Sequence, residues 1–291
     1  MTVKARPSPV AVPCTAPRLA QSTLPQQLAL GEGCQRWFQR RARYRPPGEP
    51  FEPGRCEVAL IDESIAKPWV IQHHYSGSFP AARLRVGLFI KDRLQRSQLG
   101  GVAVFSVPMN QDVVPCHLGV PASAGVELGR LVLLDHPLLA ANAETWFLAR
   151  AFRLARRELA CAGIVAYCDP VARIDNAGQV VKRGHTGTIY TAHNGRFAGR
   201  SSPRTLTLLP NGQVLNDRTL SKLRTDDVGA AYAQRLLLDA GCRRRAAGET
   251  PTAYLRALAE AGTLRRERHP GNLVFTWLLS PPSGQAAGKP A

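Results

Sequence analysis

The sequence predicts an α+β protein: a mixed central sheet with flanking helices, a basic helical insertion and disordered termini. One observation is a series of short β-branched, apolar runs separated by turn residues between positions 84 and 134. The other is an amphipathic helix at 142–159 that lies between two such runs, which is the order of a β-α-β unit. An antiparallel meander that leads into this unit gives a mixed sheet covered by helices.

Residues 1–57 form a proline-rich, basic extension, which holds nine of the 23 prolines. Its segment 35–45 alternates basic and aromatic residues and has two interpretations. It is a partly disordered tail docked by Trp37 and Phe38, or it follows a phosphate backbone while its rings stack on bases.

The catalytic domain is expected at residues 58–210. A short strand and a helix are predicted within 57–75, and Asp62 or Ser64 begins the helix. Three strands follow, and the first two are expected to be antiparallel neighbours; they are 84–91, 99–107 and 126–134.

The helix at 142–159 shows the most regular pattern in the chain. Asn142 is expected to cap it, and Glu144 suits the positive end of its dipole. The apolar strand 163–168 follows and ends at Asp169-Pro170.

The C-terminal half is predicted from turn signals and helical periodicity. The expected elements are a helix and turn at 183–199, a strand at 204–209, a helical basic insertion at 211–270, the last strand of the catalytic sheet at 271–280 and a disordered tail at 281–291.

The formal net charge of +17 favours a polyanionic partner, most often nucleic acid. The seven cysteines include no CxxC pair, so a zinc ribbon is not expected. The sequence contains no run of about 18 apolar residues, so a membrane span is not expected. We therefore expect a cytoplasmic protein.

Three positions stand out as candidates for chemistry. The pair His74-Tyr75 can move protons or bind a metal, although a polar turn with one core histidine is the alternative. Asp169 ends a buried strand, where α/β sheets open their ligand crevices, or it only forms a turn. Tyr190 lies within the polar segment 183–199 and either meets a cofactor or packs in the core.

The ordered set of motifs resembles the Mom-like DNA-modification proteins of phages and prophages. The motifs are HHYSGS at 73–78, VELGRLVLLD at 126–135, NAETWFLAR at 142–150, YCDP at 167–170 and HTGTIYTAHNGRFAG at 185–199, followed by an aromatic last strand. The resemblance covers residues 58–209 and 268–279.

This resemblance implies an acetyltransferase-like (GNAT) fold and a transferase that places a carbamoylmethyl or other acyl-derived group on the exocyclic amine of adenine in double-stranded DNA, an anti-restriction activity. It implies catalytic roles for His74, Tyr75, Asp169 and Tyr190. It also implies iron, for which His74 and Tyr75 are the candidate ligands.

Acetyl-CoA or a related acyl-CoA is the expected cofactor, near Leu133, Asn142 and Thr145. The turn before Asn142 has no glycine, unlike the acyl-CoA loops of the acetyltransferase fold. Trp69 and Phe79 are candidates to stack on a flipped base. The residues expected to contact DNA phosphates are Arg40, Arg41, Arg43, Lys222, Arg224, Arg243 and Arg244.

Two alternatives remain open. The chain could be an ordinary GNAT N-acetyltransferase that acts on a small amine or a protein. It could also be a DNA-binding protein without enzymatic activity.

Overall fold

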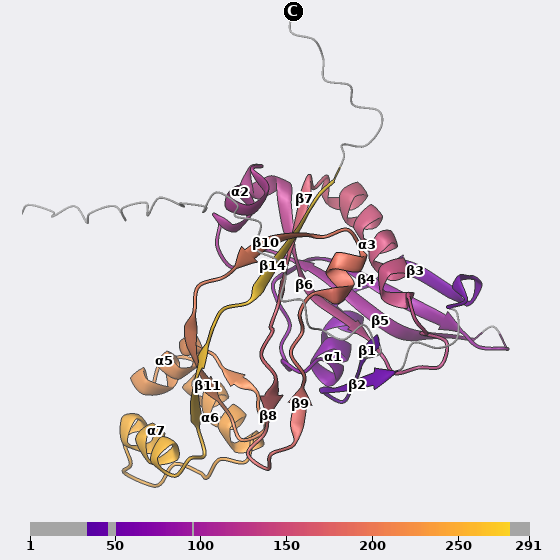
Figure 1. Cartoon of the computed structure of the whole chain (residues 1–291). Coiled ribbons are helices and arrows are strands. Elements are labelled where there is room, and N and C mark those ends of the chain that lie inside the picture. The colour runs from indigo at the N-terminus through magenta and orange to yellow at the C-terminus, as the bar shows by residue number, and fades with distance from the viewer. Residues whose placement is uncertain (1–33, 46–50, 95, 280–291) are drawn as a thin grey trace, which may run out of the picture. The chain divides into compact units, whose positions relative to one another are not determined.

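The computed structural model describes residues 34–45, 51–94 and 96–279, all within the unit Gly31–Ala291 (Figure 1). Its main sheet has seven strands among these residues, in the order β10-β14-β7-β6-β5-β4-β3. The strands are β3 (Cys56–Leu60), β4 (Ala82–Lys91), β5 (Ser97–Ser106), β6 (Gly125–Leu133), β7 (Gly163–Cys168), β10 (Arg196–Arg200) and β14 (Leu273–Leu278). Neighbours are antiparallel except for β6 and β7, which are parallel. The predicted mixed α+β class is confirmed.

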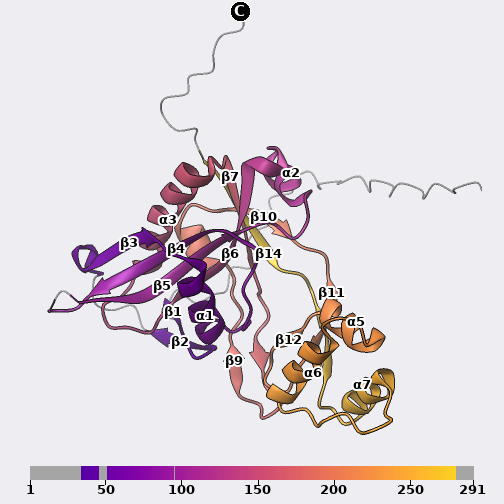
Figure 2. The same cartoon turned by 180° about the vertical axis from the view of Figure 1, so that it is seen from behind.

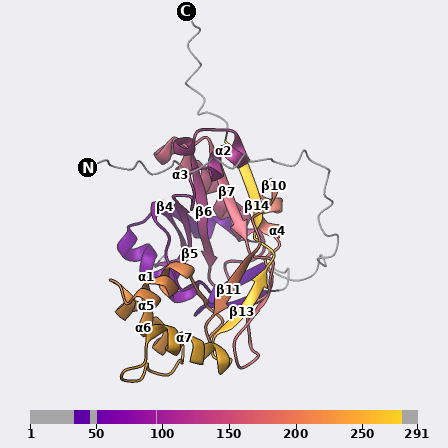
Figure 3. The same cartoon turned by 90° about the vertical axis from the view of Figure 1, so that its left-hand side faces the viewer.

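The parallel pair is created by the predicted β-α-β unit, in which α3 (Ala143–Leu159) connects β6 to β7. The two strands pair only from Gly125 to Leu128 on β6 and from Gly163 to Ala166 on β7. Both strands continue beyond this pairing, so their carboxyl ends separate. Figure 3 shows β6, β7 and β14 next to one another in the sheet.

A β-bulge marks the point where β6 leaves β7. Val104 on β5 pairs with Arg130, but the next residue, Phe105, pairs with Leu128, so Gly129 is the extra residue. A Cβ atom at Gly129 would collide with the hydroxyl of Ser106. Bulges of this kind turn a side chain in a new direction and are common beside active sites; here the redirected side chain is that of Arg130.

Helices cover both faces of the sheet, because successive strand residues point to opposite sides. On β5, Ala103 and Phe105 pack in the cluster that contains Phe147 and Phe152 of α3. Val102 and Val104 pack in the other cluster, with the short helix α1 (Glu63–His73). A third helix, α2 (Val113–Leu118), covers β7 and β14 through Val114 and Leu118. Burial of each large apolar side chain of α3 contributes about 1.5–3 kcal/mol.

Residues 34–45 form a β-hairpin, made of β1 (Cys34–Phe38) and β2 (Arg41–Arg45). Trp37 is buried in the cluster beneath α1 and forms an isolated bridge with Leu134, whereas Phe38 is 39% exposed. This segment is therefore a docked hairpin and not a partly disordered tail. The predicted disorder of the two ends falls on residues 1–33 and 280–291, which lie outside the described residues.

A basic lobe follows β10 and spans residues 204–269 (Figure 2). It contains three helices, but also a three-stranded sheet in the order β12-β11-β13, which was not expected of a helical insertion. Its elements are β11 (Arg204–Leu208), β12 (Val214–Leu215), α5 (Asp217–Thr225), α6 (Ala230–Asp239), α7 (Pro251–Glu260) and β13 (Arg265–His269). The strand predicted at 204–209 therefore belongs to the lobe and not to the main sheet.

The last strand, β14, returns to the main sheet as predicted and pairs with β7 and β10. The remaining short elements are η1 (Pro53–Arg55), which precedes β3, and η2 (Ala122–Ala124), which precedes β6. Three more lie between β7 and β10: β8 (Arg173–Ile174), β9 (Val180–Lys182) and α4 (Thr188–Ala192). Among the described residues, no helix has the length and apolar character needed to span a membrane.

Candidate active site

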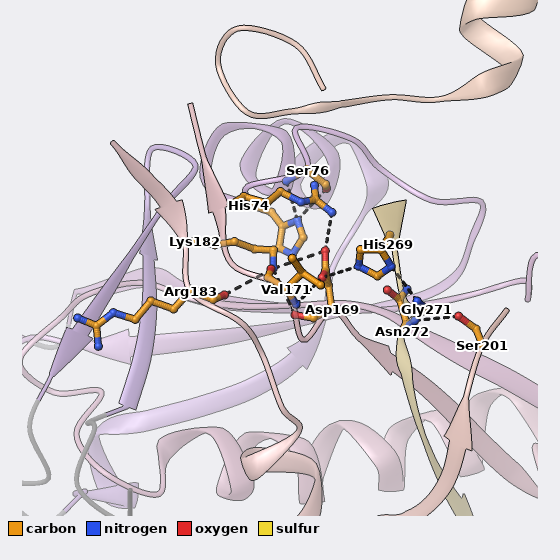
Figure 4. Close-up of polar contacts among 11 residues, drawn as sticks. His74, Ser76, Asp169, Val171, Lys182, Arg183, Ser201, His269, Gly271 and Asn272 are labelled. Carbon is orange, nitrogen blue, oxygen red and sulfur yellow. Dashed lines mark hydrogen bonds and ion pairs between the residues drawn. The ribbon is translucent and has the colours of Figure 1, made fainter. Parts of the chain in front are cut away.

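Nine side chains meet where β6 and β7 separate, and we call them the strand-end cluster. Its members are His74, Tyr75, Arg130, Asp169, Arg173, Lys182, His185, Tyr190 and His269. They come from the end of α1, the bulge of β6, the segment after β7, α4 and β13. Figure 4 shows His74, Lys182, Asp169 and His269 pointing toward one another from different parts of the chain.

Asp169 lies at the centre of the cluster and is 6% exposed. Its Oδ2 atom accepts a hydrogen bond from Arg173 Nη2 at 2.5 Å and lies 3.5 Å from Lys182 Nζ. Its Oδ1 atom accepts from the amide of Val171 at 3.0 Å and contacts His269 Nε2 at 2.9 Å. Both carboxylate oxygens are therefore occupied by protein donors.

Burial alone would raise the pKa of Asp169, but Lys182 and Arg173 outweigh it and lower the pKa to about 2. A general base works best when its pKa lies near the operating pH. This carboxylate is therefore a weak base, and protein donors already occupy both of its oxygens. The geometry favours a role in holding the two cations over a role as the acceptor of a substrate proton.

Lys182 and Arg173 are themselves buried, at 1% and 8% exposure. Burial lowers the pKa of Lys182 to about 8, although Asp169 opposes this. The ammonium group also donates to the carbonyl oxygens of Asp169 and Val171. Arg173 and Lys182 each lie 5.5 Å from the ring centroid of Tyr75, so they connect the carboxylate to the His-Tyr pair.

His74 and Tyr75 follow α1, and His74 closes the helix through its backbone amide. Their rings are 4.3 Å apart, and Trp37 of the hairpin packs on both. The Nδ1 atom of His74 accepts the amide hydrogen of Ser76 at 3.2 Å, so the neutral ring carries its proton on Nε2. Burial, and then Arg130 and Arg173, hold the pKa of His74 well below 6.5.

The preceding residue, His73, points elsewhere. Its ring packs on Trp69 at 4.9 Å and on Phe38 at 6.2 Å. Trp69 and Phe79, the two candidates for base stacking, pack against the apolar cluster beneath α1. Their rings are therefore already in contact with the protein core.

Tyr190 on α4 is buried, and its ring packs on Phe275 and Trp277 of β14. Burial raises its pKa, and so do Cys168 and Tyr75. His185 lies 5.3 Å from the Tyr190 ring, and its amide donates to the carbonyl of Asp169 at 2.8 Å. Burial and the nearby Lys182 lower the pKa of His185 to about 4, so His185, like His74, is neutral at pH 7.

Arg130 is held at the bulge by Ser78. Its guanidinium donates to the carbonyl of Ser78 at 3.2 Å and to the hydroxyl of Ser78 at 2.9 Å. Burial lowers its pKa, whereas Tyr75 and Glu127 raise it. Arg130 thereby brings a third basic group to a cluster whose one ionised carboxylate is Asp169.

The strand-end cluster does not fit an iron ion. Within the described residues, no group of three or more His, Cys, Asp or Glu side chains could hold a metal. His74 Nδ1 is bonded to Ser76. Oδ2 of Asp169 faces Arg173 and Lys182, and Oδ1 faces the Val171 amide and His269. Arg130, Arg173 and Lys182 all disfavour positive charge on His74, and they would oppose a bound cation in the same way.

The expected acyl-CoA site at the start of α3 is occupied by the protein itself. Arg36 of the hairpin is completely buried there, where it pairs with Glu144 and donates to the carbonyls of Leu139 and Ala140. A pyrophosphate bound at a helix N-terminus needs free amides and positive potential, whereas this first turn carries the Glu144 carboxylate. These residues do not fit a pyrophosphate.

The three residues expected to bind the cofactor have other surroundings. Leu133 is buried in the core opposite Gly101. Asn142 begins α3 with a left-handed backbone (φ 70°) and makes no side-chain cap, contrary to the predicted capping role. The hydroxyl of Thr145 donates to the carbonyl of Asn142 at 3.0 Å.

The residues expected to contact DNA divide into two groups. In the first group, each side chain has a partner in the protein. Arg41 pairs with Asp175, and Arg43 pairs with Asp135. Arg243 binds Glu249 through two hydrogen bonds, and Arg40 donates to the carbonyl of Ile71. In the second, Lys222, Arg224 and Arg244 are exposed and make no ion pair within the described part of the chain. The second group is the better placed to bind phosphates.

Sequence reasoning missed Arg173, Lys182 and His269. Arg173 and Lys182 stand in a polar segment, and His269 ends a run of arginines within the range that was expected to be a helical insertion. No local pattern indicates that these side chains are buried. Only the approach of β8, β9 and β13 to the end of β7 brings them to Asp169.

The depressed histidine pKa values predict loss of stability in acid. Between pH 6.5 and about 4 the unfolded chain binds a proton at His185 that the folded chain does not, so the free energy of unfolding falls as the pH falls. At pH 5 the expected loss from His185 is about 1–2 kcal/mol. Urea unfolding of the wild type and of His185→Asn at pH 7.5 and pH 5 measures it. Equal pH dependence of the two proteins would contradict the assignment.

A comparison with curated proteins gives no match. A comparison with protein-family models gives one, the Mom protein family, over residues 55–249. This range is more than half of the chain and contains every member of the strand-end cluster except His269. The chain therefore belongs to the Mom protein family.

Proposed function

We propose that the chain transfers a carbamoylmethyl or other acyl-derived group from an activated carrier to the exocyclic amine of adenine in DNA, at the strand-end cluster. The new bond to nitrogen replaces the bond to the carrier, and the carrier and one proton of the amine are released. The Mom family is one of phage DNA modification, so membership implies a DNA-modifying enzyme whose substrate is DNA. The choice of adenine, of the transferred group and of the site is our proposal.

The observation that carries the proposal is the charge of the cluster. The cluster holds three basic side chains and one ionised carboxylate, and its histidines His74 and His185 are neutral. Such a site favours an anionic ligand, and each nucleotide of DNA carries a phosphate. The net charge of +17 gives the whole molecule the same preference.

The adenine amine is paired inside the duplex, so the base has to be flipped out at a cost of a few kcal/mol. Members of the cluster that keep some exposure, Tyr75, Arg130 and His185, are the groups that we expect to meet it. Arg130 would bind the phosphate of the flipped nucleotide. Tyr75 and His185 would contact the base.

The chemistry expected of the cluster is donation of hydrogen bonds to developing negative charge. His74 accepts at Nδ1 from Ser76, and His185 accepts at Nδ1 from the amide of Gly187. Each neutral ring therefore has an N–H at Nε2 to donate. Fixed donors of this kind stabilise an oxyanion without the reorganisation that water would need. The phenol of Tyr190 is a further donor, kept neutral by its raised pKa.

The direct test is nucleoside analysis of a plasmid from cells that express the protein. The plasmid is digested to nucleosides and analysed by mass spectrometry. We expect a deoxyadenosine of increased mass, and resistance of the intact plasmid to restriction enzymes whose sites contain adenine. Normal deoxyadenosine beside a mass-shifted deoxycytidine or deoxyguanosine would instead exclude adenine as the target.

Phosphate contacts by the lobe predict a salt-dependent affinity for DNA. Replacing Lys222 and Arg224 with serine is expected to lower the slope of log Kd against log salt concentration by about 1.8, since each phosphate contact contributes about 0.9. Fluorescence anisotropy with a labelled duplex measures it. The matched control, Arg153→Ser with Arg157→Ser, removes the same charge from the exposed side of α3. Equal slopes for both double variants would rule out the lobe contact.

A further inference from the structure

His269 is the last residue of β13 and joins the basic lobe to the strand-end cluster. The lobe reaches the cluster along the β11–β13 pair, in which His269 lies opposite Arg204. Its side chain is 2% exposed, although its strand neighbour Arg268 is exposed. It lies outside residues 55–249, the range matched by the family model.

Both ring nitrogens of His269 are used (Figure 4). The amide of Gly271 donates to Nδ1 at 3.1 Å, so this atom carries a lone pair and the proton of the neutral ring is on Nε2. Nε2 lies 2.9 Å from Asp169 Oδ1, to which it therefore donates. This geometry fixes the direction of the hydrogen bond between the lobe and the carboxylate.

The turn after His269 is anchored on the opposite side. Gly271 has a φ of +99°, and a Cβ atom there would collide with the carbonyl oxygen of Ser201. The amide of Asn272 donates to the hydroxyl of Ser201, and the amide of Ser201 donates back to the carbonyl of Asn272, both at 2.8 Å. Glycine is thus needed to bring the amide of residue 271 to the histidine ring.

The other donors to the carboxylate of Asp169 come from its own segment, residues 171–182. Within the described residues, His269 is the one side chain of the lobe that bonds to this carboxylate. Without it, Oδ1 would keep only the amide of Val171, and rotation of the carboxylate would move the cations bound to Oδ2.

We propose that His269 is a positioning residue that orients the Asp169 carboxylate, and thereby Arg173 and Lys182. The arrangement of these side chains in the strand-end cluster then depends on the position of β13 in the lobe. The effect of His269 on DNA modification rests on the proposed function. Its effect on Asp169 does not, because the hydrogen bond exists whatever the reaction is.

Three variants of the full-length protein separate this role from a structural one. His269→Gln places an amide N–H near the position of Nε2 and keeps the donor to Asp169. His269→Asn places an oxygen near the position of Nδ1, so it keeps the contact with the Gly271 amide but does not reach Asp169. His269→Leu removes both contacts.

The first measurement is the pKa of the Asp169 carboxyl, from a ¹³C NMR titration assigned with Asp169→Asn. A hydrogen bond to a charged group contributes about 1.5–3 kcal/mol, and one pKa unit equals about 1.4 kcal/mol. We expect a rise of about one to two units in His269→Asn and His269→Leu, and little change in His269→Gln. An unchanged pKa in the Asn and Leu variants would overturn the proposal.

The second measurement is the yield of modified nucleoside at equal amounts of folded protein. We expect about a tenfold loss in His269→Asn and His269→Leu, with His269→Gln near the wild type. Full modification by His269→Asn with a raised Asp169 pKa would remove the functional part of the proposal. If the wild type itself modifies no DNA, the proposed function fails, and the titration still decides the role of His269.

Discussion

Replacing Asp169 with asparagine is expected to lower the free energy of unfolding by about 3–5 kcal/mol. This is the usual cost of removing one partner of a buried ion pair, because the other charge stays buried without compensation. Arg173 and Lys182 would remain buried with no carboxylate beside them. The asparagine NH₂ group would face the donors now bonded to Oδ2, or the side chain would turn and place it against the His269 donor. Urea unfolding at pH 7.5 measures the loss.

Removing one of the two cations as well is expected to restore part of the lost stability. In the double variant Asp169→Asn with Lys182→Met, one of the two uncompensated cations is also removed. This variant should be more stable than Asp169→Asn alone by about 1–2 kcal/mol, the scale of coupling between contacting residues. A loss below about 1 kcal/mol in Asp169→Asn, or no rescue, would mean that the carboxylate does not hold these cations in the folded protein.

Replacing Tyr190 with phenylalanine is expected to reduce DNA modification by about 10²–10⁴-fold, the usual contribution of a proton-donating group in the transition state. The ring packing on Phe275 and Trp277 is retained. No hydrogen bond of the hydroxyl to another described residue is observed, so its removal leaves no partner unsatisfied. The nucleoside yield at equal protein concentration measures the loss.

Stability separates this effect from misfolding. The unfolding free energy of Tyr190→Phe should stay within about 0.5 kcal/mol of the wild type. Trp277→Phe, on the same core face, is the matched control: it should lose stability while it keeps the Tyr190 hydroxyl. Undiminished modification by Tyr190→Phe would remove the tyrosine from the chemistry.

The main features of the fold follow from apolar periodicity. The meander of β4, β5 and β6, helix α3 and the strands β7 and β14 were all predictable from their apolar residues. The helix shows one apolar face, and β5, β7 and β14 are short apolar runs that are buried on both faces of the sheet. β13 was not predictable, since the sequence Arg-Arg-Glu-Arg-His has no apolar residue. It is a strand because β11 supplies its backbone partners from about 60 residues earlier in the chain.

The hairpin at 34–45 is a second case in which residue types alone did not predict the structure. Its basic residues suggested a polyanion partner, but Arg36 binds Glu144 and two carbonyls of its own chain, more than 100 residues away. A buried arginine cannot be told from an exposed one by residue type. The partner becomes evident only when the hairpin docks at the start of α3.

The candidate site was predictable in position but not in charge. His74, Tyr75, Asp169 and Tyr190 were singled out by their motifs, and they meet in one cluster. The role of Asp169 could not be read from an Asp-Pro turn, because it depends on Lys182 and Arg173, whose burial is a tertiary property. These cations lower the pKa of the carboxyl and make a metal ion unfavourable at the same place.

The central claim is that a base of DNA is modified at the strand-end cluster. The most direct test compares the nucleosides of plasmids made with the wild type, with Arg130→Met and with the surface variant Arg153→Ser, at matched levels of folded protein. We expect a heavier deoxyadenosine with the wild type and with Arg153→Ser, and at most a trace with Arg130→Met. Unmodified deoxyadenosine with the wild type, or equal modification by Arg130→Met, would contradict it.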